Sequence, residues 1–315
     1  MRSPIAPKLS LLGLLAFLVL FTPRIQAQNL TLEGQTGGFI TPTAYVVYSA
    51  KDQFFSHPAV GYHFVNASSV IGNIHTFSIA EGMGNRAELG YTRSVHTEGD
   101  SAAFSSLWHY AGMNIFNGKV VAIKDGWRSP LTPGLAAGFV VRTGDKFVTG
   151  FFDGKSYTNG DVYVAATKTW AHPPLPLLVN LGWKATNASI YGIGGQATRF
   201  GGRLFGGLGI PLPAPFHTVI VPAAGFTQEP PTSKNLGAIL IGGRAHLPTT
   251  LDYAVRVTQK DHPHFAFDIG VGQVAGMIGT TVVNAAPAGA PPVLVPVPVN
   301  LEARHVIGVG LSIRP

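Results

Sequence analysis

The sequence contains no cysteine. A chain without cysteine has no disulfide framework, even in an oxidising compartment outside the cytoplasm. It also has no thiol at which a lipid could be attached after processing of the N-terminus. The composition therefore excludes a small disulfide-stapled scaffold and a lipoprotein.

Charged residues are scarce as well. Asp, Glu, Lys and Arg make up 12% of the chain, whereas a soluble domain has about 25%. A deficit of this size indicates that much of the surface faces something other than water. The formal net charge is +7, and it falls to +4 without the first 27 residues, which carry Arg2, Lys8 and Arg24 and no acid. The remaining basic residues are scattered singly, which argues against a nucleic-acid partner.

Long apolar runs are missing after the N-terminus. Residues 9–21 form such a run, between Lys8 and Ile25-Gln26-Ala27. This pattern predicts a secretory signal peptide cleaved after Ala27; the alternative is a retained anchor, for which the run is short. The longest later candidate, residues 285–299, is broken by five prolines. An exported, apolar chain without spanning helices is expected to cross a membrane as a closed β-barrel, which satisfies all backbone groups within lipid.

The sequence does contain alternation, most clearly in two segments near its end. Residues 250–258 place Tyr253 and Val255 on one face and Asp252 and Arg256 on the other, and residues 264–272 alternate in the same way. Because successive side chains of a strand point to opposite faces, these segments predict a β-hairpin. The apolar face is expected to meet lipid and the other face to meet the lumen.

Comparable segments recur along the chain. The expected strands cover residues 58–66, 70–80, 86–95, 107–124, 134–143, 161–170, 177–186, 199–210, 217–228, 236–246, 250–258, 264–272 and 303–314. Since bacterial single-chain barrels use an even number, they predict an all-β, transmembrane antiparallel β-barrel of about 12–14 strands. Residues 276–300, rich in Ala, Pro and Val, are expected to form a loop.

The domain boundaries follow from these segments. We expect a signal peptide (1–27), an N-terminal segment (28–57) and a β-barrel (58–315). Within the N-terminal segment, Tyr45-Val46-Val47-Tyr48 is interpreted either as a short strand or as part of a plug.

Several motifs resemble a family of uncharacterised bacterial outer-membrane β-barrels defined by a domain of unknown function. They are Gly-Gln-Thr-Gly-Gly at residues 34–38, Asp-Val-Tyr-Val-Ala-Ala-Thr-Lys at residues 161–168, Leu-Val-Asn-Leu-Gly-Trp-Lys-Ala-Thr-Asn at residues 178–187, and the glycine-rich residues 191–195. The resemblance implies a barrel in the cell outer membrane. It implies no substrate.

Charges on the small-residue faces are the candidate functional residues. In a barrel they point into the lumen, because a charge facing lipid at mid-depth costs about 2–4 kcal/mol. Two interpretations remain open: the charges line an aqueous pathway and select solutes, or they form internal salt bridges that fill a narrow lumen. The lumen-lining candidates are Arg86, Glu88, Arg142, Lys184, Asp252, Arg256, Asp268, Arg304 and Arg314.

Catalytic and cofactor motifs are not found in the sequence. His262 and His264 lie beside Asp261, but no third metal ligand is evident. The glycine-rich residues 201–207 lack the Lys-Ser/Thr of a phosphate loop, and no Gly-x-Ser-x-Gly elbow occurs. His109 and Asn114 lie on an expected strand, but no serine is singled out as a nucleophile. We therefore predict no enzyme activity, no catalytic residues, no metal and no cofactor.

The sequence thus favours an outer-membrane β-barrel protein that acts as a small-solute channel or as a structural envelope component. The expected partners are outer-membrane lipid, the barrel-assembly machinery and small solutes, with no nucleic acid. One alternative is a secreted soluble β-sandwich that binds carbohydrate or protein. A second alternative is a barrel enzyme that hydrolyses lipids.

Overall fold

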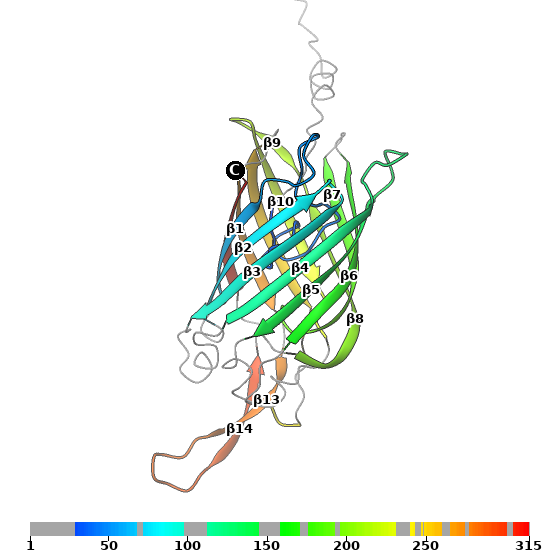
Figure 1. Ribbon diagram of the computed structural model, residues 1–315. Helices are drawn as coiled ribbons and strands as arrows, with labels where there is room; N and C mark the ends of the chain where they lie inside the picture. Colours follow the sequence, from blue (N-terminus) through cyan, green and yellow to red (C-terminus); the bar gives the residue numbers. More distant parts are fainter. Residues whose placement is uncertain are drawn as a thin grey trace, which may run out of the picture.

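The computed structural model of the protein describes residues 29–67, 72–97, 112–144, 158–170, 176–192, 196–230, 240–242, 247, 249–259, 265–274, 277–300 and 305–314. The expected signal peptide lies outside these residues. The described part of the chain is built from strands (Figure 1). No helix within it is long and apolar enough to cross a membrane.

The strands follow one another with short interruptions. They are β1 (Ala59–Asn66), β2 (Asn73–Met83), β3 (Ala87–Thr97), β4 (Gly112–Ile123), β5 (Gly134–Gly144), β6 (Thr158–Trp170), β7 (Leu177–Ala188), β8 (Gln196–Gly209), β9 (Leu212–Ala214), β10 (Thr218–Thr227), β11 (Thr250–Gln259), β12 (Phe265–Val274), β13 (Met277–Asn284), β14 (Leu294–Asn300) and β15 (His305–Ile313).

Twelve of these strands form one closed antiparallel barrel. Strands β1 to β8 pair in sequence order, and β8, β10, β11, β12 and β15 continue the sheet until β15 pairs with β1. The short β9 pairs only with the end of β10, while β13 and β14 form a separate two-stranded sheet. The prediction of an all-β barrel of about 12–14 strands is confirmed.

The side chains of the barrel alternate as the sequence predicts. On β11, Tyr253 is 53% exposed and Val255 40%, whereas Asp252 and Arg256 are buried inside. The same outward row of apolar side chains runs around the barrel through Val60, Phe77, Leu89, Phe116, Phe139, Val164, Leu181, Leu204 and Ile269. An exposed apolar belt of this extent suits lipid and not water. The soluble β-sandwich is therefore wrong, because the strands form one closed barrel whose apolar face is on the outside.

The two ends of the barrel differ. At one end, here called the short-turn end, β2 and β3 are joined by residues 84–86, where Gly84 (φ 58°) and Asn85 (φ 53°) form a tight turn. The connections at the other end, the long-loop end, are residues 67–72, 98–111, 145–157, 189–195, 228–249 and 275–304, and four of these six are long. Arg314 follows β15 at the short-turn end. Short turns at one end and long loops at the other are typical of outer-membrane barrels.

One expected strand is wrong. Of residues 236–246 the structure describes 240–242, which form a bend and a turn, and β10 pairs directly with β11, so no strand lies between these two in the barrel. The apolar residues Leu240 and Leu247 of this connection are buried among side chains of the barrel interior. Their apolar character reflects burial inside the barrel and not contact with lipid.

The prediction of a loop at residues 276–300 is also wrong. It forms the β13–β14 hairpin, which projects beyond the long-loop end (Figure 1). Pro296 and Pro298 are tolerated because β14 pairs with β13 alone among the described residues, and an edge strand need not donate from every backbone nitrogen. The hairpin base packs on the connection before β11, where the Ile241 N–H donates to Thr280 O at 2.7 Å.

Candidate functional site

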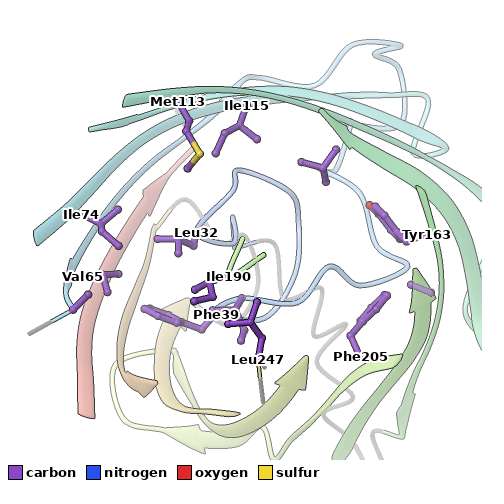
Figure 2. Packing of buried hydrophobic residues seen from close by; sticks show 14 of the residues in the cluster. Leu32, Phe39, Val65, Ile74, Met113, Ile115, Tyr163, Ile190, Phe205 and Leu247 are labelled. Carbon is purple, nitrogen blue, oxygen red and sulfur yellow. The ribbon is translucent and has the colours of Figure 1, made fainter. Parts of the chain in front are cut away.

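The lumen of the barrel is occupied by the chain's own N-terminal segment. Residues 29–49, here called the plug, lie inside the barrel, and nearly all of them are buried (Figures 1 and 2). The plug contains no strand; Leu30 bridges to Thr36, and Gly37 to Pro42, in two tight reversals. Both ends of the plug lie toward the short-turn end. The Ser49 N–H donates to Asn85 Oδ1 in the β2–β3 turn, and the Leu30 N–H donates to Ser312 Oγ next to the end of β15. Of the two interpretations of residues 45–48, the plug is confirmed.

The number of strands explains why the interior needs a plug. A barrel of about eight strands is just wide enough to be filled by its own side chains, and the diameter grows with strand number. A barrel of twelve strands therefore encloses more space than its inward side chains fill. The irregular backbone of the plug must in turn find hydrogen-bond partners on the wall.

Arg142 on β5 makes the first of three charged anchors. Its Nη2 donates to Glu33 Oε2 of the plug at 2.7 Å and to Asp161 Oδ2 of β6 at 2.8 Å. The Arg142 side chain is fully buried. A buried guanidinium shared by two carboxylates is stable only while all three groups stay together.

Glu88 on β3 is the second anchor. Its carboxylate accepts hydrogen bonds from the backbone N–H groups of Thr36 (2.9 Å) and Val47 (2.8 Å) and from the Thr36 hydroxyl. Lys119 Nζ on β4 lies 3.6 Å from the same carboxylate and donates to the carbonyl oxygens of Thr36 (2.6 Å) and Thr43 (3.1 Å). This ion pair therefore joins two distant turns of the plug to the wall.

The third anchor is the pair of Arg256 on β11 and Asp268 on β12, which lie opposite each other in register. Arg256 Nε lies 2.8 Å from Asp268 Oδ1, and Nη1 donates to Gly37 O of the plug at 2.9 Å. Asn29 Nδ2 donates to Asp268 Oδ2 at 2.6 Å. The charged lumen residues thus hold the plug as well as each other.

Close packing adds to these bonds. Gly34 has φ +82°, and a Cβ there would lie 2.2 Å from Thr92 Oγ1 of β3. Gly82 on β2 has the same role on the wall, since a Cβ there would lie 1.9 Å from Val47 O. The glycine-rich motif at residues 34–38 therefore serves the fit of the plug in the lumen.

The short-turn end of the plug is held by Tyr45. Its hydroxyl donates to Asp125 Oδ2 at 2.8 Å and lies 2.6 Å from Thr169 Oγ1, and Lys168 Nζ lies 2.6 Å from Asp125 Oδ1. Burial raises the pKa of Tyr45 far above its usual value, so the hydroxyl keeps its proton and its role as donor.

Six of the nine predicted lumen-lining residues are buried inside the barrel: Glu88, Arg142, Lys184, Asp252, Arg256 and Asp268. Arg86 is exposed, because the turn at residues 84–86 ends before β3 and takes it out of the alternation. Arg314 follows β15 at the mouth, with its guanidinium 5.8 Å above the ring of Tyr48. Arg304 lies outside the described residues. A role of these charges in solute passage remains a prediction.

Three charged residues of the three anchors were not among the candidates. Asp161 and Lys119 are buried wall residues that pair with Arg142 and Glu88. Alternation already places Asp161 on the face opposite Val162, and this signal was sufficient to find it. Glu33 lies in an irregular segment, where no periodicity indicates which way a side chain points.

Three cavities lie beside the plug in the described part of the chain. Cavities of about 60 Å³, beside Gly38 and Arg256, and about 70 Å³, beside Leu32 and Phe39, lie between the plug and the wall. A water molecule takes up about 30 Å³ in the liquid. A third cavity, of about 290 Å³, lies at the short-turn end beside Tyr45 and Asp125.

One family model matches the sequence over residues 27–203, and its description is "Protein of unknown function (DUF3034)". The chain belongs to this family. The match covers the plug and strands β1 to β7, so the expected resemblance is confirmed, and the protein is an outer-membrane β-barrel of an uncharacterised family.

Solved structures show a similar fold at very low sequence identity. The structure titled "NanC porin structure in rhombohedral crystal form" is 10% identical, with a TM-score of 0.46, and the match covers 82% of this chain and 100% of that one. A "KdgM porin" is 10% identical, with a TM-score of 0.44 and coverage of 82% and 99%. The β domain of the Bordetella autotransporter BrkA is 12% identical, with a TM-score of 0.39 and coverage of 84% and 100%. No curated protein matches the sequence.

Proposed function

We propose that the protein is an outer-membrane channel for small solutes and that the plug is its closed gate. The observation that carries the proposal is the chemistry of the lumen wall. Polar and charged side chains on β3, β4, β5, β6, β11 and β12 face inward and hold an irregular segment by hydrogen bonds. Water that fills an open lumen can replace such bonds, each of which contributes about 0.5–1.5 kcal/mol net between neutral groups and about 1.5–3 kcal/mol when one group is charged.

The orientation of the plug supports a gate. In outer-membrane barrels the short turns face the periplasm, so both ends of the plug face the periplasm and the long loops face outward. If residues 1–27 are removed after Ala27, the plug begins at the new N-terminus and is tied covalently only through residues 50–58. It could then leave the lumen on the periplasmic side without breaking the barrel.

Planar-bilayer conductance tests the proposal. A variant that lacks residues 30–48 should insert, migrate as a folded barrel and conduct far more current than the wild-type protein. A folded but non-conducting variant would contradict the channel and favour a structural envelope component. A variant that lacks residues 277–300 is the control, because that hairpin lies outside the barrel and its removal should leave conductance at the wild-type level.

A reversible disulfide between the plug and the wall distinguishes plug movement from barrel damage. In Ala44→Cys/Gly134→Cys a Cβ at position 134 would lie 3.5 Å from the Cβ at position 44, within the range of a disulfide, and the chain has no other cysteine. Oxidation should abolish any spontaneous openings, and reduction should restore them. Openings that persist in the oxidised protein would show that the plug is not the gate.

A further inference from the structure

Glu33 of the plug is held in a way that suits a small carboxylate. Arg142 Nη2 donates to Glu33 Oε2 at 2.7 Å, and Arg142 Nε donates to Oε1, so the guanidinium binds both oxygens of one carboxylate. Arginine recognises carboxylates by this forked geometry, whether they belong to a protein or to a small molecule. Glu33 is also the one charged residue of the plug. The plug therefore presents to Arg142 what a free carboxylate would present.

The wall around this plug carboxylate carries a net positive charge. A fourth, smaller cavity, of about 20 Å³, lies beside the carboxylate and is lined by Asp161 and Lys184 of the wall. Together with Arg142, which bonds to Asp161, the wall supplies two cations and one anion. Arg203 and Glu229, joined by a hydrogen bond from Arg203 Nε to Glu229 O at 2.8 Å, add one charge of each sign. Release of the plug thus leaves one unmatched positive charge facing the open lumen.

Polar atoms beside the fork have no partner. Arg142 Nη1, both side-chain polar atoms of Asn159 and the Tyr163 hydroxyl are buried and make no hydrogen bond among the described residues. Asn159 lies opposite Arg142 in register. Tyr163 lies opposite Lys184, and Figure 2 shows its ring on the inner face of the wall, beside the plug. Because a buried polar group without a partner is costly, a ligand with hydroxyl groups next to its carboxylate would satisfy this wall better than the plug does.

We propose that Glu33 occupies the place of the solute's own carboxylate and that the channel takes small hydroxylated carboxylates. The inference rests on the proposed channel function and names its substrate class. Such a solute competes with Glu33 for Arg142, so solute binding favours release of the plug. A ligand that binds only the open lumen raises the population of the open state about tenfold when it is present at ten times its dissociation constant.

Protease cleavage of the plug in the full-length, folded barrel measures this release. Gluconate should raise the rate of cleavage between residues 29 and 49 about tenfold. Glucose lacks the carboxylate and should have no effect, while propionate lacks the hydroxyl groups and should have a weaker one. Equal release by glucose, or by sodium chloride at the same ionic strength, would overturn the carboxylate site. Equal release by propionate would overturn the role of the hydroxyl groups.

Two substitutions locate the effect, each compared with the same variant without gluconate. Arg142→Lys keeps the positive charge and loses the fork. If it binds gluconate about tenfold more weakly, the increase in cleavage should fall from about tenfold to about twofold. Arg256→Met loosens the plug at the third anchor and leaves Arg142 in place, so the increase should stay about tenfold. The same response in both variants would place the ligand elsewhere and overturn the proposal.

The channel and its substrate class fail separately. If gluconate has no effect while the variant without residues 30–48 conducts, the substrate class is wrong and the channel stands. If gluconate releases the plug but that variant does not conduct, the carboxylate site stands, and the channel is wrong together with the transport of its ligand.

Discussion

Neither the plug nor the β13–β14 hairpin is part of the barrel wall, and the two segments differ in burial. Residues 29–49 carry one charged residue, Glu33, and residues 276–300 carry none. The plug is buried and irregular, and the side chains of the wall satisfy its backbone. The hairpin is exposed and regular, and its two strands satisfy each other. Local composition therefore does not decide burial, whereas the presence of a complementary wall does.

The largest effect is expected at the first plug anchor. Arg142→Met leaves Glu33 and Asp161 buried without their cation, which costs about 3–5 kcal/mol. The plug should become accessible to protease in the folded barrel, with cleavage between residues 29 and 49. Arg86→Met is the control, because Arg86 is exposed and its guanidinium donates to the carbonyl oxygens of Val121 and Ala122 on β4, away from the plug. Equal protease resistance of the two variants would show that Arg142 does not hold the plug.

A second pair of substitutions distinguishes a side chain exposed to lipid from one exposed to water. Val255 on β11 and Val283 on the hairpin are 40% and 45% exposed. Val255→Arg should lower folding stability by about 2–4 kcal/mol, because the charge faces lipid. Val283→Arg should leave stability unchanged within about 0.5 kcal/mol, because the hairpin projects beyond the barrel. The measurement is urea titration of folding into lipid vesicles, and equal losses would place both valines in one environment.

The smallest expected difference is between alanine substitutions at two glycines. Gly34 of the plug has φ +82° and Gly289 of the hairpin φ +87°, but a Cβ would meet Thr92 at the first and nothing within 4 Å at the second. Alanine at either position bears the strain of a positive φ, about 1 kcal/mol. Gly34→Ala should bear an added packing cost of about 1–3 kcal/mol. Protease cleavage of the plug should therefore rise in Gly34→Ala only; a rise in both variants would assign the effect to backbone strain.

The sequence predicted the barrel because its strands repeat a period-two pattern that lipid enforces. Tyr253 and Val255 had to face out and Arg256 had to face in, since the reverse would place a charge in the membrane. Alternation also placed Asp161 inside. The strand predicted at residues 236–246 was wrong because its apolar residue Leu240 packs inside the barrel and does not face lipid. The loop predicted at residues 276–300 was wrong because two apolar segments pair with each other there in spite of their prolines. A short apolar run has the same composition in both settings.

The plug anchors could not be predicted in the same way. Glu88 and Arg256 were correct as inward-facing residues, but their partners, Thr36 and Gly37, lie in a segment without periodicity. Thr36 lies 52 positions from Glu88 in the sequence, and Gly37 lies 219 positions from Arg256. Contacts over such separations depend on barrel closure, which no local pattern encodes. The sequence therefore left open whether the charges line a pathway or fill the lumen.

The joint between β1 and β15 has a consequence for assembly. The backbone N–H of Leu30 donates to Ser312 Oγ, and Asn29 to Asp268, across 282 and 239 positions of the chain. These contacts require the last strand to have arrived, although the residues that make them are the first described residues of the chain. The segment that begins the described chain is thus among the last to be fixed in place, because its partners on β12 and β15 belong to the strands that close the barrel.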